Sequence, residues 1–488
     1  MSDPAINQFM GEGIAAALPE MYLAAAICVL LMVDVFAGPK RRGITPSVTL
    51  LILAVGAALT SRYALPLGHV VLFSGSYVSD SLATLLKMFG FLFVAVALLY
   101  SRQGLEYRGM LRGEYYVLAL TALLGIFVVI SAGSLLTLYV GVELLALSLY
   151  SMVAFDRDSG IAAESAIKYF VLGAIASGAL LYGMSMIYGM TGTLLLDELA
   201  SKLTGTPSLG TVLGVVFLVV AVSFKFGAVP FHMWVPDVYH GAPTPVALFV
   251  STAPKIASFA LVYRLMAHGL GGVADAWTQM LSIVAVLSLV IGNVAAIAQT
   301  NLKRMLAYSA IANVGFILLG FVAGTAQGYQ AALYYMLVYV IVTLGSFGVI
   351  LLASRKGFES DELEHFKGLH ARDPALALMM MALMFSTAGI PPFVGFWAKL
   401  QIIQVLWNTG HSALVMIAAS VSVIGVFYYL RVVKLMYFDA PPAGLPTAAT
   451  AGGAARGVRA TLGINAAMAL VLGLMPNALL SLCARVLG

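Results

Sequence analysis

Charge and cysteine are both scarce in this sequence. Asp, Glu, Lys and Arg make up 10% of the 488 residues, whereas soluble domains usually carry about 25%. Hydrophobic residues make up 61% and the mean hydropathy is +0.99, so a soluble globular fold is excluded. The two cysteines, Cys28 and Cys483, lie near opposite ends and provide neither metal-site spacing nor a disulfide framework. Any iron–sulfur or haem chemistry must therefore reside in other chains.

Long hydrophobic runs take the place of charge. They are about 20 residues long, which matches the ~30 Å hydrocarbon layer of a bilayer, and the alternation typical of β-barrel strands is missing. We therefore expect an all-α polytopic membrane protein. The first run follows Asp3 and Glu12 rather than basic residues, so we interpret it as a retained helix and not a signal peptide. The about 14 expected transmembrane helices are 14–36, 45–65, 81–100, 115–132, 134–154, 162–189, 209–229, 243–266, 276–298, 303–322, 327–353, 375–403, 412–436 and 458–479.

Basic residues are distributed unevenly among the expected loops. Counted together with the adjoining helix ends, most lie in loops that follow odd-numbered helices, and the loops after even-numbered helices hold only Arg62, Lys202 and Arg264. Because basic loops stay on the cytoplasmic side, the pattern predicts a multi-pass protein of the bacterial inner membrane with both termini in the periplasm. The sequence pI of about 9.0 follows from this topology and does not indicate a nucleic-acid partner. The segments expected in the cytoplasm include 37–44, 101–114 and 355–374.

A few charged residues remain inside the expected helices. A charge at the bilayer centre costs ~2.5–3.5 kcal/mol, so such residues normally face a protein interior or a wet cavity. Glu143 and Lys225 have no opposite charge within four residues, and we expect each to pair across helices. The five lysines within the helices are Lys87, Lys168, Lys225, Lys255 and Lys399, and Glu143 is the matching anion.

Most of these charged residues, and His232, have a structural interpretation as well as a functional one. Lys168 lies four residues after Glu164, so a surface ion pair competes with a relay role. Lys255 and Lys399 are candidates either for proton transfer or for bonding carbonyls of broken helices, and His232 either for a satisfied core residue or for a proton carrier. Lys87 is expected to be structural and to snorkel to an interface. Glu20 and Asp34, near the ends of the first helix, are expected to be solvated.

Two of the expected helices contain proline deep within an apolar stretch. The segments are AVPFHMWVPDVYHGAPTPV (228–246) and TAGIPPFVGFWAKL (387–400). Pro230 in the first, and Pro391 and Pro392 in the second, remove backbone hydrogen bonds, so discontinuous helices that line a polar interior are expected. If helices 4–8 and 9–13 form two five-helix units, their odd number inverts the second unit, as in secondary transporters. The expected segments are 1–110, 111–270 (first repeat), 271–440 (second, inverted repeat) and 441–488 (a connection and the last helix).

Four segments together resemble a known family. They are LYVGVELLALSLYSMVAF (138–155), IKYFVLGAIASG (167–178), VPFHMWVPDVYHGAPTPV (229–246) and TNLKRMLAYSAIANVGFILLG (300–320). They are similar to the antiporter-like membrane subunits of proton-pumping NADH:quinone oxidoreductase, respiratory complex I, and the resemblance covers essentially the whole chain. The PDVYHGAP stretch most resembles the subunit N branch. Subunit L is disfavoured because no long lateral helix is expected after residue 440.

The resemblance implies a buried proton relay. Glu143, Lys225, Lys255, Lys399 and Lys168 match the family's functional positions in helices 5, 7, 8, 12 and 6. It further implies that this chain has no cofactor or metal of its own, that flavin, iron–sulfur clusters and quinone belong to partner subunits, and that sister antiporter-like subunits and lipid surround it. Two alternatives stay open: a structural membrane scaffold of the same complex, and a stand-alone cation/proton antiporter subunit.

Overall fold

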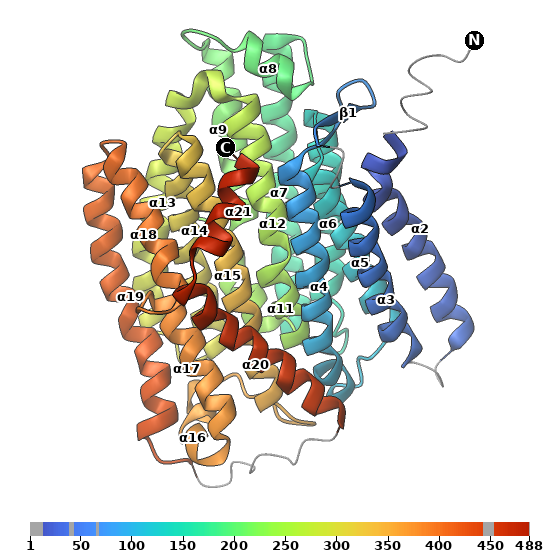
Figure 1. The fold of residues 1–488 in the computed structure, drawn as a ribbon, viewed down its shortest axis with the longest axis vertical. Coiled ribbons are helices and arrows are strands. Elements are labelled where there is room, and N and C mark those ends of the chain that lie inside the picture. The colour runs from blue at the N-terminus through green and yellow to red at the C-terminus, as the bar shows by residue number, and fades with distance from the viewer. Residues whose placement is uncertain (1–12, 39–42, 65–67, 443–452, 488) are drawn as a thin grey trace.

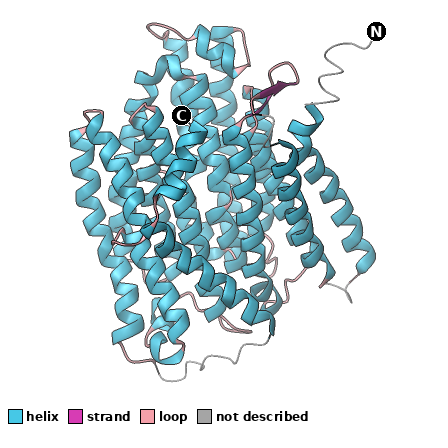
Figure 2. Cartoon of the chain, in the orientation of Figure 1, coloured by secondary structure: helices cyan, strands magenta, loops and turns pink. Residues whose placement is uncertain are grey.

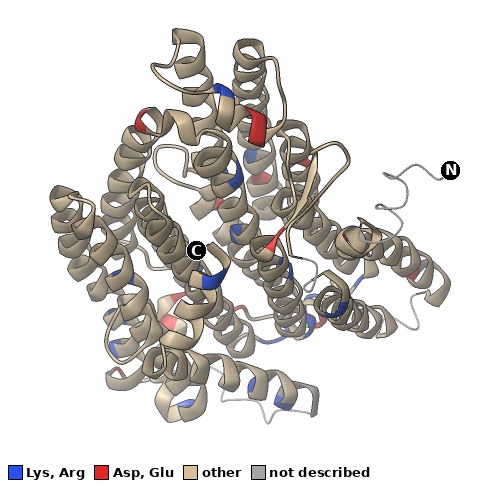
Figure 3. Cartoon of the chain, turned by 45° about the horizontal axis from the view of Figure 1, so that its top comes forward, with Lys and Arg blue, Asp and Glu red and all other residues tan. Residues whose placement is uncertain are grey.

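The computed structural model describes residues 13–38, 43–64, 68–442 and 453–487 as an elongated bundle of helices (Figure 1). The expected segments 37–44 and 441–488, and the two termini, lie partly outside the described residues. Most of the ribbon carries no charge, as Figure 3 shows. The bundle has one end near α8 (Leu196–Lys202) and another near α16 (Leu369–Arg372), below called the α8 end and the α16 end.

The first half of the chain begins with a three-helix N-terminal segment. It consists of α2 (Ile14–Ala37), α3 (Ile44–Leu59) with a π-helical extension, and α4 (Ser81–Tyr107). A short antiparallel hairpin, β1 (Val70–Leu72) and β2 (Tyr77–Ser79), precedes α4 (Figure 2) and was not expected from the sequence. The helices that follow are α5 (Gly113–Ile130), α6 (Leu135–Val153), α7 (Gly160–Thr191), α9 (Leu209–Phe226), α10 (Trp234–Gly241), α11 (Thr244–Thr252) and α12 (Pro254–Val262), the last extended by a π-helix over Tyr263–Gly269.

The second half has the same order of elements as the first. A pair of helices is followed by one long helix and then by a helix that is broken in two. The described elements are α13 (Ala274–Ile297), α14 (Leu302–Val322), α15 (Ala326–Ala353), α16, α17 (Pro374–Ala388), α18 (Val394–Asn408), α19 (Ser412–Phe438), α20 (Gly453–Leu474) and α21 (Asn477–Leu487). Side chains cap many helix starts and satisfy free N–H groups there, as Ser134 does for α6 and Asn301 for α14.

Thirteen described helices are long and apolar enough to cross a membrane. The difference from the expected number lies in the twelfth expected helix, 375–403, which is divided into α17 and α18 of 15 residues each. The last expected helix, 458–479, instead ends at Leu474, because Pro476 follows and cannot continue it. The most enclosed spans are 244–269, α14 and α15, so the core of the bundle lies along these helices.

The two halves share a packing feature. In the pair α5 and α6, a Cβ added to Gly125 or Gly141 would meet the backbone of the other helix, and Gly292 and Gly315 have the same position between α13 and α14. Only glycine lets helices approach so closely. Both pairs open an expected five-helix unit. The repeat and the inversion of its second unit stay predictions.

Candidate functional site

The first helix break lies between α9 and α10. Helix α9 ends at Phe226 and Gly227 follows in a left-handed conformation, so Pro230 lies in the non-helical segment 227–233. The last carbonyl groups of a helix lack intrahelical partners. Lys255, on α12, donates a hydrogen bond to the Phe226 carbonyl at 2.7 Å. The buried amine of Lys255 therefore stabilises the broken end of α9.

Three helices bring Glu143 and Lys225 together through a serine. The Lys225 amine on α9 donates to the Ser177 hydroxyl of α7 at 3.4 Å, and this hydroxyl donates in turn to the Glu143 carboxylate of α6. The expected pairing across helices is thus mediated by Ser177, which the sequence analysis missed because an uncharged serine costs little in a membrane helix. A cavity of about 30 Å³ beside Lys225 has room for one or two water molecules.

The second helix break has the same arrangement around a different lysine. Helix α17 ends at Ala388, Gly389 follows in a left-handed conformation, and Pro391 and Pro392 lie before α18 begins at Val394. Lys399 of α18 donates to the Ala388 carbonyl at 2.8 Å. Its amine also lies 5.6 Å from the centre of the Phe316 ring, a favourable position for a cation. A cavity of about 20 Å³ is lined in part by Lys399.

Hydroxyl and amide side chains connect the region between the two breaks. Ser251 lies one helical turn before Lys255, and the Tyr339 hydroxyl of α15 donates to the Ser251 carbonyl at 3.5 Å. Tyr339 also lines the small cavity at Lys399. In the same cavity wall Tyr335 donates to the side-chain Oδ1 of Asn313 at 2.7 Å. Polar groups that could carry hydrogen-bonded water therefore extend from one lysine toward the other.

His232 lies apart from this arrangement. It is half-buried in the segment between α9 and α10, and its Nδ1 has no hydrogen-bond partner among the described residues. No hydrogen bond joins it to Lys255 in the described part of the chain. Its role as a proton carrier stays a prediction.

Comparison with known proteins identifies the family. Residues 132–425 match the family model described as NADH:quinone oxidoreductase/Mrp antiporter, TM. The chain belongs to this family. A relative from Thiobacillus denitrificans, named NADH-quinone oxidoreductase subunit N, is 52% identical over 97% of both chains, and one of the same name from Alkalilimnicola ehrlichii is 51% identical over 98% of both.

Solved structures agree with this assignment. A chain in respiratory complex I from Thermus thermophilus matches with a TM-score of 0.81 and 31% identity over 96% of this chain and 99% of that one. A chain of the Mrp complex from Dietzia sp. matches with a TM-score of 0.84 at 23% identity, over 97% of each chain, and shows the shared fold alone.

Lys168 lies at the surface of this antiporter-family chain. It is 46% exposed and pairs with Glu164 at 2.7 Å, as the local interpretation expected. It also pairs with Asp237 of α10 at 3.0 Å, and Asp237 binds Arg304 of α14 at the same distance. Burial raises the pKa of Asp237, but the hydrogen bonds from Lys168 and Arg304 outweigh it and leave the pKa below its ordinary value. Asp237 thus links α7, α10 and α14.

Three charged residues near the N-terminal hairpin and the first helix have partners that were not expected. Lys87 is 1% exposed and pairs with Glu20 at 2.7 Å and with the Tyr77 hydroxyl at 3.0 Å, so the expectations that Lys87 snorkels and that Glu20 is solvated were wrong. The cause is the hairpin, which places Tyr77 over this pair. Asp34, also expected to be solvated, accepts a hydrogen bond from Thr45 at 2.7 Å.

Arg264 was assigned to a loop, and it is buried in the π-helical end of the α12 segment. Its guanidinium binds both carboxylate oxygens of Asp80, at 2.7 and 2.9 Å, and the Ile130 carbonyl at 3.1 Å. Burial raises the pKa of Asp80, but the charge of Arg264 lowers it further, so the net shift is downward. This bidentate pair ties the start of α4 to the α12 segment.

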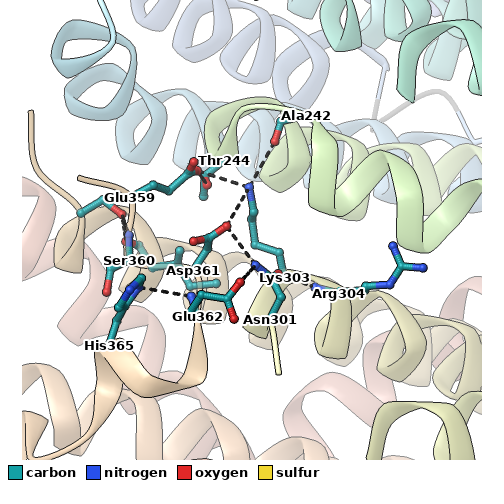
Figure 4. A network of polar contacts seen from close by, with 12 residues as sticks. Ala242, Thr244, Asn301, Lys303, Arg304, Glu359, Ser360, Asp361, Glu362 and His365 are labelled. Atoms are coloured by element: carbon teal, nitrogen blue, oxygen red, sulfur yellow. Dashed lines mark hydrogen bonds and ion pairs between the residues drawn. The ribbon is translucent and has the colours of Figure 1, made fainter. Parts of the chain in front are cut away.

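A network at the α16 end joins the two halves of the family fold (Figure 4). Lys303, 2% exposed at the start of α14, donates to the Ala242 carbonyl and to Glu359, both at 3.3 Å, and lies 3.7 Å from Asp361. Glu359 also accepts hydrogen bonds from Thr244 and Arg108. The acidic segment 359–362 therefore holds the loop after α10 against the start of α14.

No group of three or more His, Cys, Asp or Glu side chains in the described residues is arranged to hold a metal ion. The chemistry that the described arrangement can perform is the binding and transfer of protons by buried amines and a carboxylate.

Proposed function

We propose that this chain translocates protons across a bacterial inner membrane as a subunit of an NADH:quinone oxidoreductase. The observation that supports the proposal most is the lysine at each helix break: Lys255 on the Phe226 carbonyl and Lys399 on the Ala388 carbonyl. A break in a membrane helix is tolerated where it lines a polar interior. An amine at such a break is both a structural partner and a proton-binding group.

The loading step involves Glu143, Ser177 and Lys225. Ser177 relays the hydrogen bond from the amine to the carboxylate, so a shift of α6 relative to α9 changes the attraction between the two charges. At ~5 Å and an effective dielectric constant of ~20 this attraction is about 3 kcal/mol. Gaining or losing it changes the proton affinity of the amine by about a hundredfold.

The transfer step runs along the core of the bundle. Lys225 lies in the last turn of α9, and α12 binds this turn twice, since the Ser258 hydroxyl donates to the Lys225 carbonyl and Lys255 donates to the Phe226 carbonyl. Beyond Lys255, the Ser251 backbone carbonyl accepts a hydrogen bond from the Tyr339 hydroxyl, and Tyr339 lines the cavity of Lys399. In this proposal Lys399 releases the proton toward the α8 end, and the α16 end faces the cytoplasm.

The energy for transport comes from other subunits in this proposal. Flavin, iron–sulfur clusters and quinone would carry out the redox chemistry in partner chains, and sister antiporter-like subunits would lie beside this one in the membrane. Buried charges at subunit contacts would then transmit the redox-driven change, because charge pairs interact strongly in a low-dielectric interior.

The test replaces Lys225 with Met in the assembled complex. Quinone-linked NADH oxidation and proton pumping should fall together, while NADH oxidation by an artificial acceptor stays normal. The matched control is Lys202→Met, which removes an exposed lysine on α8 and should change neither activity. Wild-type quinone-linked activity and pumping in a fully assembled Lys225→Met complex would refute the proposal.

Two alternative functions have distinct outcomes. A scaffold is favoured by the carbonyl bonds of Lys255 and Lys399, and it predicts full pumping when either Glu143 or Lys225 is replaced. A stand-alone antiporter is favoured by the fold shared with the Mrp chain. It predicts that this chain, expressed alone, rescues a sodium-sensitive strain that lacks its own antiporters.

A further inference from the structure

Two cavities follow one another along α15 and α18. The small one, about 20 Å³, is lined by Lys399 and Ala398 on α18 and by Tyr335 on α15. A larger groove of about 710 Å³ lies where α15 begins and α18 ends. Since α14 starts in the network at the α16 end, α15 starts at the opposite end of the bundle, and the groove lies toward the α8 end.

The groove is polar but uncharged. Its lining includes six carboxamide side chains and, on α21, Ser481 and Cys483, and no Asp, Glu, Lys or Arg. Carboxamides both donate and accept hydrogen bonds, so this surface offers partners to water molecules. The carboxamides are Gln327, Gln330, Gln401, Gln404, Asn408 and Asn477.

One apolar side chain lies between the two cavities. Ile402 follows Ala398 by four residues and precedes Val405 by three, so the three share one face of α18. Ala398 lines the small cavity, Val405 lines the groove, and Ile402 is fully buried between them. On α15, Tyr335 lines the small cavity and Ala331, about one turn earlier, lines the groove.

Ile402 is also held from the side of α14. A Cβ added to Gly320 would lie 2.9 Å from its Cδ1 atom, so the side chain packs directly on the α14 backbone. With a rise of about 1.5 Å per residue, the layer it forms is roughly one helical turn thick. Along α18, the cavity at Lys399 and the groove are therefore separated by the apolar side chain of Ile402.

We propose that Ile402 is a hydrophobic gate between Lys399 and the carboxamide groove. An apolar constriction excludes water and stops proton movement until it opens. This inference rests on the proposed function, in which Lys399 is the last proton-binding group. The gate prevents protons from flowing back from the α8 end to Lys399 when the enzyme is idle.

The first experiment measures passive proton leak in proteoliposomes that contain the assembled complex, under an imposed pH gradient and without NADH. A serine at the gate that lowers the barrier by about 1.4 kcal/mol raises the leak about tenfold. We expect this rise for Ile402→Ser and none for Ile402→Val, which keeps the site apolar. The matched control is Ile403→Ser, at a half-buried position outside the two cavities. A wild-type leak in assembled Ile402→Ser complex would overturn the proposal.

The second experiment measures access to each side of the gate. In a Cys28→Ala, Cys483→Ala background, an impermeant maleimide added on the α8 side should label a Gln404→Cys variant and leave a Val338→Cys variant, in the wall of the small cavity, unlabelled. Absence of labelling at Gln404→Cys, or labelling of Val338→Cys with Ile402 intact, would overturn the gate. Neither experiment requires NADH turnover, so each tests the gate independently of the relay. The relay fails a separate test if a Lys399→Met variant still pumps protons.

Discussion

At the scale of single residues, the sequence reveals the groups whose burial is costly and hides the inexpensive ones. Glu143, Lys225, Lys255 and Lys399 are visible because each places a charge in an apolar run. Ser177 could not be identified from the sequence, because burying a hydroxyl in a membrane helix costs little free energy. Its bridging role depends on the packing of the three helices that meet at this residue. Lys87 was misinterpreted for a similar reason: its partner Glu20 lies 67 residues away in the sequence, and no local pattern indicates the contact.

Ser177 provides a prediction at this scale. Ser177→Ala should lower proton pumping, because it removes the hydroxyl that joins the Lys225 amine to the Glu143 carboxylate. Ser177→Thr keeps the hydroxyl and should retain most of the activity. Pumping is measured as protons moved per NADH oxidised in proteoliposomes. Equal loss in both variants would indicate a packing defect at this site and count against the bridging role.

At the scale of elements, the proline positions were enough to locate the helix breaks. The groups that stabilise the broken helix ends could not be predicted from the sequence. The prolines explain why α9 and α17 stop, but the bonds from Lys255 and Lys399 to the broken ends depend on how distant helices pack. The hairpin of β1 and β2 was missed because three-residue strands leave no detectable alternation. Segment 359–362 was expected only as a basic, cytoplasmic loop, and its acidic side chains turn out to bind Lys303.

The close contact at the second break makes a stability prediction. Gly395→Ala should destabilise the chain, because the added methyl group would overlap the Ser386 carbonyl oxygen, and overpacking of this kind costs roughly 1–3 kcal/mol. The matched control is Gly189→Ala on α7, where a Cβ meets nothing within 4 Å. Thermal unfolding of the purified complex should shift for the first variant only. An unchanged transition for Gly395→Ala would contradict the described geometry.

Glu359 predicts a pH dependence for the α16-end network. Burial raises the pKa of Glu359, but the charges of Lys303 and Arg108 and the bond from Thr244 lower it further, so the net shift is downward. Because the pKa of Glu359 is lower in the folded than in the unfolded chain, its ionised carboxylate stabilises the fold at pH values above the ordinary glutamate pKa of about 4.3. This contribution is lost as the pH falls through the lowered pKa of the folded state. Glu359→Gln should therefore unfold at lower temperature than wild type at pH 7, with the difference shrinking in acid. A difference that is constant with pH would contradict this role.

At the scale of the whole molecule, the distribution of basic residues and the length of apolar runs predicted the fold class and most helix positions. The orientation in the membrane is a prediction that single-cysteine labelling tests. A Lys356→Cys variant should react only with reagent on the cytoplasmic side and a Lys202→Cys variant only with reagent in the periplasm. Labelling of both from one side would contradict the topology.

The central claim is that protons cross the membrane through the relay that begins at Glu143. The most direct measurement is the number of protons pumped per NADH oxidised by assembled complex carrying Glu143→Gln, compared with Glu164→Gln, which changes an exposed glutamate on α7. We expect Glu143→Gln to lose most of its pumping while Glu164→Gln stays near the wild-type value. A wild-type ratio of protons to NADH in the Glu143→Gln complex would contradict it.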